Sequence, residues 1–224
     1  MYTNGNFDAH LAALMFLGTL GLLFLLAVVT LAFGFVGSRR WVPYPLLAIA
    51  ALLAAYGLLL AAFSFTSYDR TVARGDEKYF CEMDCHIAYS VVSVQCARTI
   101  GDATADGEFC VVTLRSHFDE RTIAPWRGNS PLRPDAPSLT VIDGNGHRYV
   151  ISAVGQKAWE AAHGQQHSLT DNLRPGESYE TTWVFDVPED PQSLRMLAEV
   201  RGFPTYMLIG DETSPRHGKT YLAL

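Results

Sequence analysis

The residues best able to do chemistry gather in one short stretch, Cys81-Glu-Met-Asp-Cys-His86. Two thiols, an imidazole and a thioether so close together suit three kinds of site. The simplest is a local disulfide, or a pair of reduced thiols, formed by Cys81 and Cys85. The second is haem c attachment through Cys81 and Cys85, with His86 as the axial ligand. The third is a soft copper site that also uses Met83.

Two further cysteines, Cys96 and Cys110, are expected to form a disulfide. They fall in two segments rich in Val, Tyr and Phe, His86–Ala97 and Phe109–Phe118, which are predicted to pair as antiparallel strands around a loop over 97–108. One register sets Cys96 opposite Cys110, Val94 opposite Val112 and Val92 opposite Leu114. The alternative is two free, buried thiols.

The elements that position these residues divide into two parts. Residues 1–68 contain three charged groups, Asp8, Arg39 and Arg40, whereas the remaining residues carry 22 acidic and 15 basic side chains. Two uncharged apolar runs, at about 10–37 and 45–65, are each long enough to cross a bilayer of roughly 30 Å. The sequence therefore predicts two transmembrane helices joined by a short turn.

Orientation follows from the basic residues. The inter-helix turn carries Arg39 and Arg40, while the N-terminal 38 residues carry no Lys or Arg. The positive-inside rule places this turn in the cytoplasm and both termini outside. We expect a bacterial cytoplasmic (inner) membrane protein with its other domain on the periplasmic or extracellular side. Small residues in both spans, among them Gly18, Gly21 and Gly57, suit packing of the two helices on each other or on helices of a larger complex.

The remaining chain is predicted to be all-β. After a linker over 69–86, short strands separated by turns suggest an antiparallel β-sandwich over 87–224. Asp143-Gly-Asn-Gly146 is a strong hairpin signal, and Ser178–Val187 alternates apolar and polar residues as a half-buried strand does. Further strands are predicted at Ser193–Arg201, Thr205–Ile209 and Thr220–Leu224, with a short helix at Lys157–Ala162.

The strand motifs resemble those of a known domain family. Ser138-Leu-Thr-Val-Ile-Asp-Gly-Asn-Gly-His-Arg-Tyr149, Leu173-Arg-Pro-Gly-Glu177 and Trp183-Val-Phe-Asp-Val-Pro188 look like the immunoglobulin-like (telokin-like) domains of bacterial extracytoplasmic proteins of unknown function. The resemblance spans roughly residues 87–209 and implies a sandwich that binds or scaffolds. It brings no catalytic residues with it.

The overall plan also bears on the copper alternative. Two N-terminal spans followed by an outside sandwich are similar to cytochrome oxidase subunit II, in which a Cys-x-x-x-Cys-x-x-x-His motif occurs late in the domain. Here the cysteines precede the predicted sandwich, and Tyr89 stands where that histidine would be. Cys81-x-x-x-Cys85-His86 resembles a rarer haem-attachment motif that has one residue more than Cys-x-x-Cys-His. Haem c also needs an apolar helical pocket, whereas the segment that follows here is expected to be a strand. We therefore expect no cofactor, with haem c or copper as the alternative.

A long connection over 119–137 carries several prolines together with Pro125, Trp126 and Arg127. This composition is typical of a docking element, although the loop can equally pack on its own domain. There is no phosphate-binding loop or hydrolase motif, and the acidic balance disfavours nucleic acid. We expect a non-enzymatic accessory subunit that docks on integral-membrane subunits of a respiratory or photosynthetic electron-transfer complex, without a small-molecule substrate. An electron-transfer protein that uses Cys81, Cys85 and His86 is the alternative.

Overall fold

The computed structural model describes residues 2–81, 86–189, 191 and 193–224. They form two compact units. The strand unit comprises the chain up to Asn4, Asp69–Arg201 and Lys219–Leu224, and the helical unit comprises Gly5–Tyr68 and Gly202–Gly218. The boundary expected from the sequence lies between residues 68 and 69 and assigns 202–218 to the β-domain. In the structure, 202–218 groups with the helices instead.

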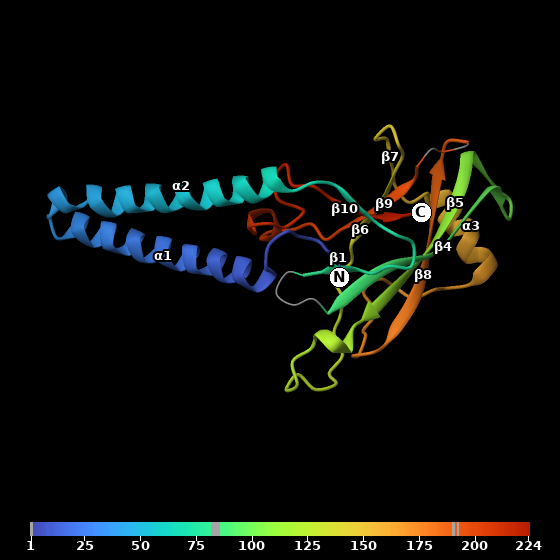
Figure 1. The fold of residues 1–224 in the computed structure, drawn as a ribbon, viewed down its shortest axis with the longest axis horizontal. Helices are drawn as coiled ribbons and strands as arrows, with labels where there is room; N and C mark the ends of the chain where they lie inside the picture. Colours follow the sequence, from blue (N-terminus) through green and yellow to red (C-terminus); the bar gives the residue numbers. More distant parts are fainter. Residues whose placement is uncertain (1, 82–85, 190, 192) are drawn as a thin grey trace. The chain divides into compact units, whose positions relative to one another are not determined.

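The helical unit is built on two long antiparallel helices (Figure 1), α1 (Ala9–Phe35) and α2 (Pro43–Thr66), joined through the short 3-10 helix η1 (Arg39–Trp41). The Asp8 carboxylate caps α1 by accepting a hydrogen bond from the backbone N–H of Leu11 at 2.8 Å. Pro43 and Pro45 occupy the first turn of α2, where a missing N–H costs nothing. Both helices are long and apolar enough to cross a membrane, as predicted.

The strand unit contains two five-stranded sheets. The first has the order β1 (Tyr2–Thr3), β3 (Lys78–Phe80), β4 (Ile87–Ile100), β5 (Ala103–Phe118), β8 (Ser178–Val187). The second has the order β2 (Arg70–Val72), β10 (Thr220–Ala223), β9 (Arg195–Glu199), β6 (Ser138–Ile142), β7 (Arg148–Tyr149). Figure 1 shows the long strands β4, β5 and β8 side by side.

Purely antiparallel sheets were the wrong prediction. Each sheet has one parallel pair at an edge, β1 with β3 and β2 with β10. Two of the strands involved, β2 and β3, lie in the segment 69–86 that was predicted to be a linker. The reason is that their partners are the two ends of the chain, which no local pattern can indicate.

One hydrophobic core lies between the two sheets. Its buried members include Val112, Leu114 and Phe185 from the first sheet and Val141 and Met196 from the second. A second, smaller cluster covers the opposite face of β8, where Val184 packs with Phe109 and, from the helix α3 (Ala153–His163), with Trp159. The two sheets therefore form a β-sandwich-like arrangement, with α3 extending the helix predicted at Lys157–Ala162 in both directions.

The β4–β5 hairpin confirms the predicted disulfide. Cys96 pairs directly with Cys110 across the two strands, with their Cα atoms 4.1 Å apart, and Val94 pairs with Val112. The predicted pairing of Val92 with Leu114 is wrong, because a bulge between Val91 and Ser93 shifts the register and brings Val91 opposite Leu114. The predicted loop over 97–108 is also wrong, since the strands continue to a tight turn at Gly101 and Asp102.

The hairpin predicted at Asp143–Gly146 is confirmed between β6 and β7. The carboxylate of Asp143 accepts hydrogen bonds from the backbone N–H groups of Asn145 and His147, both at 2.9 Å, and from the Tyr149 hydroxyl at 3.0 Å. Burial disfavours the ionised carboxylate, but the hydrogen bonds from His147, Tyr149 and Asn145 outweigh it and lower the pKa of Asp143 to about 2.

The strand predicted at Thr205–Ile209 is wrong. Thr205–Met207 is a 3-10 helix, η3, and it belongs to the helical unit. A short, mainly apolar run such as Tyr206–Ile209 does not by itself distinguish a strand from a helical segment.

Candidate functional site

The cysteine-histidine stretch is only partly described. Cys81 is buried and disulfide-bonded, and no cysteine among the described residues is free. Met83 and Cys85 lie outside the described residues. A disulfide sulfur is not a thiolate, so the sulfur of Cys81 does not fit a haem or copper site unless that bond is first reduced.

His86 is held by its own domain. Its Nδ1 atom lies 2.7 Å from the Thr122 hydroxyl, and its ring stacks on Phe118 with the ring centroids 5.5 Å apart. Its side chain is buried, and its backbone carbonyl accepts a hydrogen bond from the N–H of Asp119 at 2.9 Å. These contacts tie the start of β4 to the chain that follows β5.

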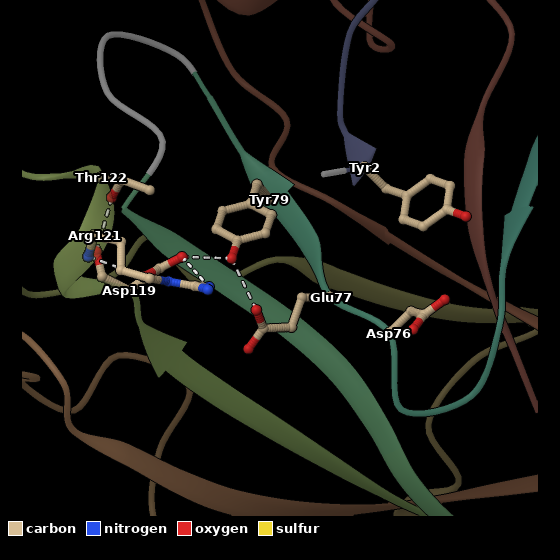
Figure 2. Close-up of a pocket in the computed structure, with 7 residues that line it drawn as sticks. All are labelled: Tyr2, Asp76, Glu77, Tyr79, Asp119, Arg121 and Thr122. Carbon is tan, nitrogen blue, oxygen red and sulfur yellow. Dashed lines mark hydrogen bonds and ion pairs between the residues drawn. The ribbon is translucent and has the colours of Figure 1, made fainter.

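Next to His86, at the end of the first sheet, lies a polar pocket of about 530 Å³ (Figure 2). It is lined by the residues Tyr2, Asp76, Glu77, Tyr79, Asp119, Arg121 and Thr122. Three elements supply them: β1, β3 with the turn before it, and the 3-10 helix η2 (Glu120–Thr122) with its cap.

Four of the side chains in this pocket, those of Glu77, Tyr79, Asp119 and Arg121, form a continuous hydrogen-bonded network. The Tyr79 hydroxyl lies 2.6 Å from Asp119 Oδ2 and 2.8 Å from Glu77 Oε2. Asp119 also accepts hydrogen bonds from Arg121 Nε and Nη2, both at 2.8 Å. On the other side, Glu77 Oε1 lies 2.7 Å from His117 Nδ1. No sequence motif indicates this network, since its members come from separate segments of the chain.

The electrostatics of the network favour fixed protonation states. The hydrogen bonds from Arg121, followed by the one from Tyr79, hold the pKa of Asp119 well below its usual range despite the burial of its carboxylate. Burial, together with the hydrogen bonds to Asp119 and Glu77, raises the pKa of Tyr79 well above its usual range. At neutral pH Asp119 is therefore ionised and Tyr79 protonated, which suits a network that joins β3, β5 and η2 and not a proton transfer between these two groups.

The Asp119 carboxylate links stability to pH. Its pKa is lower in the folded than in the unfolded protein, so its contribution to stability is present above the unfolded pKa and is lost as the pH falls through acid values. We expect Asp119→Asn to lower the free energy of unfolding by about 1–2 kcal/mol at neutral pH, an amount kept small because Arg121 is exposed. The loss should begin to shrink only below the unfolded pKa of about 4, and it should disappear only as the pH falls through the lower pKa of the folded protein.

Urea unfolding of the full chain at neutral and acid pH measures both effects. Asp102→Asn, in the exposed turn between β4 and β5, is the matched control. It should leave the free energy of unfolding unchanged at both pH values. An equal loss at both pH values for Asp119→Asn would show that the ionised carboxylate contributes nothing.

The 119–137 connection combines a packed base with an exposed tip. Ile123 and Leu132 pack on the core, and Leu132 and Leu173 exchange two backbone hydrogen bonds of 2.8 and 2.9 Å. The Arg127 guanidinium lies 4.7 Å from the centre of the Phe118 ring and donates to the Ser130 carbonyl at 2.6 Å. Arg127 thus braces the loop. The side chain of Trp126 is 87% exposed, and Pro125 beside it is exposed as well.

No protein-family model and no curated protein sequence matches the chain. Two solved structures show partial similarity. A conserved hypothetical protein from Bacillus anthracis has a TM-score of 0.39 at 18% identity, covering 50% of this chain and 82% of its own. The secreted protein MPT63 from Mycobacterium tuberculosis has a TM-score of 0.41 at 11% identity, covering 71% of this chain and 100% of its own.

Proposed function

We propose that the protein is a non-catalytic accessory subunit, anchored by α1 and α2, whose immunoglobulin-like domain docks on a membrane complex outside the cytoplasm. The observation that carries the proposal is Trp126, an almost fully exposed tryptophan on a loop with a fixed base. Aromatic anchors dominate the binding energy of protein interfaces. A loop already held by Ile123, Leu132 and Arg127 also loses less conformational entropy on binding than a free one.

Two further features support this proposal. The Cys96–Cys110 disulfide is typical of an oxidising compartment outside the cytoplasm. In the helices, a Cβ atom added at Gly18, Gly21 or Gly57 would meet nothing within 4 Å. These glycines therefore do not serve the packing of α1 on α2, and they leave room for close approach by helices of other subunits.

The host we propose is a respiratory or photosynthetic electron-transfer complex. The alternative, in which the chain itself carries electrons at Cys81, Cys85 and His86, requires that the disulfide at Cys81 be opened first. A visible absorption spectrum and a metal analysis of the purified full chain separate the two. A haem Soret band or bound copper would support the alternative and contradict the proposal.

Trp126→Ala tests the docking surface. We expect the variant to bind its membrane partner about 30-fold more weakly, because a central aromatic anchor contributes about 2 kcal/mol. Its melting temperature should stay close to that of the wild type, since exposed side chains seldom affect stability. Co-purification in mild detergent followed by identification of the bound subunits measures the first effect, and thermal unfolding the second.

Val150→Ala is the matched control, because Val150 is an apolar side chain that is 71% exposed on another part of the strand unit. It should leave both association and melting unchanged. If the full chain behaves as a free monomer with no co-purifying subunit, the docking proposal is wrong.

A further inference from the structure

The segment Phe203–Met207 combines uncharged sequence with exposed apolar side chains. From Gly202 to Gly210 there is no charged residue. Phe203 is 78% exposed, and Tyr206 and Met207 are 41% and 47% exposed, whereas Leu208 and Ile209 are buried. The segment therefore has a packed side and an apolar side that faces outward.

The segment contacts both candidate membrane spans. The Phe203 ring contacts the ring of Phe16 in α1 edge to face, with centroids 6.0 Å apart. The Tyr56 hydroxyl in α2 donates a hydrogen bond to the Met207 carbonyl at 2.6 Å. Figure 1 shows red-coloured loops of the C-terminal part of the chain at the N-terminal end of α1 and the C-terminal end of α2.

The depth of these contacts follows from the charges. Arg39 and Arg40 mark one boundary of the hydrocarbon layer, because a free charge does not enter it. The other boundary is roughly 30 Å, or about 20 helical residues, away. Counted from this turn, Phe16 lies near the second boundary, and Tyr56 lies roughly 10 Å inside it. This is the depth at which interfacial segments bury their apolar side chains.

A segment at that depth must satisfy its own backbone, since lipid offers no hydrogen bonds. Pro204 has no N–H to satisfy. The N–H groups of Thr205, Met207 and Leu208 donate within the segment, to the carbonyls of Gly202, Pro204 and Thr205 at 2.9, 2.8 and 3.1 Å. Tyr56 then supplies the donor that the Met207 carbonyl needs.

Residues that follow the segment, Gly210 and His217, make hydrogen bonds within the helical unit. The backbone N–H of Asn6 donates to the Gly210 carbonyl at 2.9 Å, and its side-chain amide donates to the Phe63 carbonyl at 3.0 Å. His217 Nε2 lies 3.0 Å from Asn6 Oδ1. Gly210 has a φ of +78°, and a Cβ there would stand 2.4 Å from the Cβ of Phe7. The chain that follows the segment is thus fixed against the helical unit.

We propose that Phe203, Tyr206 and Met207 insert into the lipid bilayer, in the leaflet at the Asp8 end of α1, as a third membrane contact of the chain. The occupant of this surface is lipid, because the exposed face continues the apolar surface of α1 and α2, and because the N–H groups of Thr205 and Met207 and the carbonyl of Met207 are already hydrogen-bonded. The inference rests on the proposed membrane anchoring by these helices.

Photo-crosslinking of the full chain in phosphatidylcholine nanodiscs tests the inference. The photoreactive residue p-benzoylphenylalanine replaces Phe203 in one variant, Phe24 in the middle of α1 in a second, and Val150 in a third. Phe24 and Val150 are both exposed, at 67% and 71%, so accessibility is matched. We expect lipid adducts at positions 203 and 24 with a yield several-fold above that at position 150.

The three positions separate the two proposals. Adducts at 24 but not at 203 would overturn the insertion of this segment and leave the anchoring intact. No adduct at 24 would overturn both. Crosslinks from 203 to another protein or to a second copy of the chain, in place of lipid, would show that a protein and not the bilayer covers this surface.

Discussion

Replacement of Lys78 by methionine is expected to cause one of the largest losses of stability in the strand unit. Lys78 is fully buried in β3, in the first sheet. Its ammonium donates hydrogen bonds to the carbonyls of Ala198 and Thr220, both at 2.8 Å, which lie on β9 and β10 in the second sheet. It also lies 4.9 Å from the centre of the Phe80 ring. One side chain therefore connects β3 of the first sheet to β9 and β10 of the second.

Methionine has nearly the same length but cannot donate. Each hydrogen bond from a charged group contributes about 1.5–3 kcal/mol, so we expect the free energy of unfolding to fall by roughly 3 kcal/mol or more. The melting temperature should fall by roughly 6–12 °C for a domain of this size. Thermal unfolding of the full chain in detergent measures the change.

Lys157→Met is the matched control, because Lys157 is exposed on α3. It should alter stability by less than about 0.5 kcal/mol. If both variants melt together with the wild type, the bonds from Lys78 to the second sheet do not contribute to stability.

Removal of the Cys96–Cys110 disulfide is expected to have a similar effect. The bond closes a loop of about 15 residues, so the chain-entropy estimate of its contribution is about 3 kcal/mol. Cys110 is also fully buried in the core. The double variant Cys96→Ala, Cys110→Ala should therefore melt roughly 6–12 °C below the wild type. A variant is preferable to a reducing agent, which would also reach the disulfide at Cys81.

A non-covalent pair in the same hairpin provides the control. Thr99 and Thr104 face each other across β4 and β5. Their joint replacement by alanine should cost no more than about 1 kcal/mol. A double cysteine variant that melts no lower than this control would mean that hairpin pairing alone holds the two strands.

Local patterns were reliable where the physical cause is itself local. Asp143 accepts hydrogen bonds from residues two, four and six positions later, so its hairpin is encoded within one short segment. Alternation in Ser178–Val187 predicted β8 with its observed bounds, although it did not show that α3 covers Val184 on the outer face. Pairing of Cys96 with Cys110 followed from matching two adjacent strands, and it failed only at the bulge near Val92.

The polar pocket could not be predicted in the same way. Tyr79, Asp119 and His117 have no sequence motif in common, and they meet because β3 and β5 are both paired with β4. Trp126 was identified as a candidate by composition, but its exposure and the packed base of its loop depend on Ile123, Leu132 and Phe118.

By itself, the sequence determined the two apolar helices, the β-rich character of most of the rest and the Cys96–Cys110 pairing. These depend on charge, on hydrophobic period and on neighbouring strands, all of which act over a few residues. Only the tertiary structure decided that 69–86 contributes two strands, that Lys78 joins the sheets, and that 202–218 folds with the helices. Each of these depends on partners more than 70 residues away along the chain, such as Tyr2 with Lys78, Tyr56 with Met207 and Lys78 with Thr220. Contacts of that separation leave no periodic trace in the local sequence, because the energy that selects them arises only when the chain has folded.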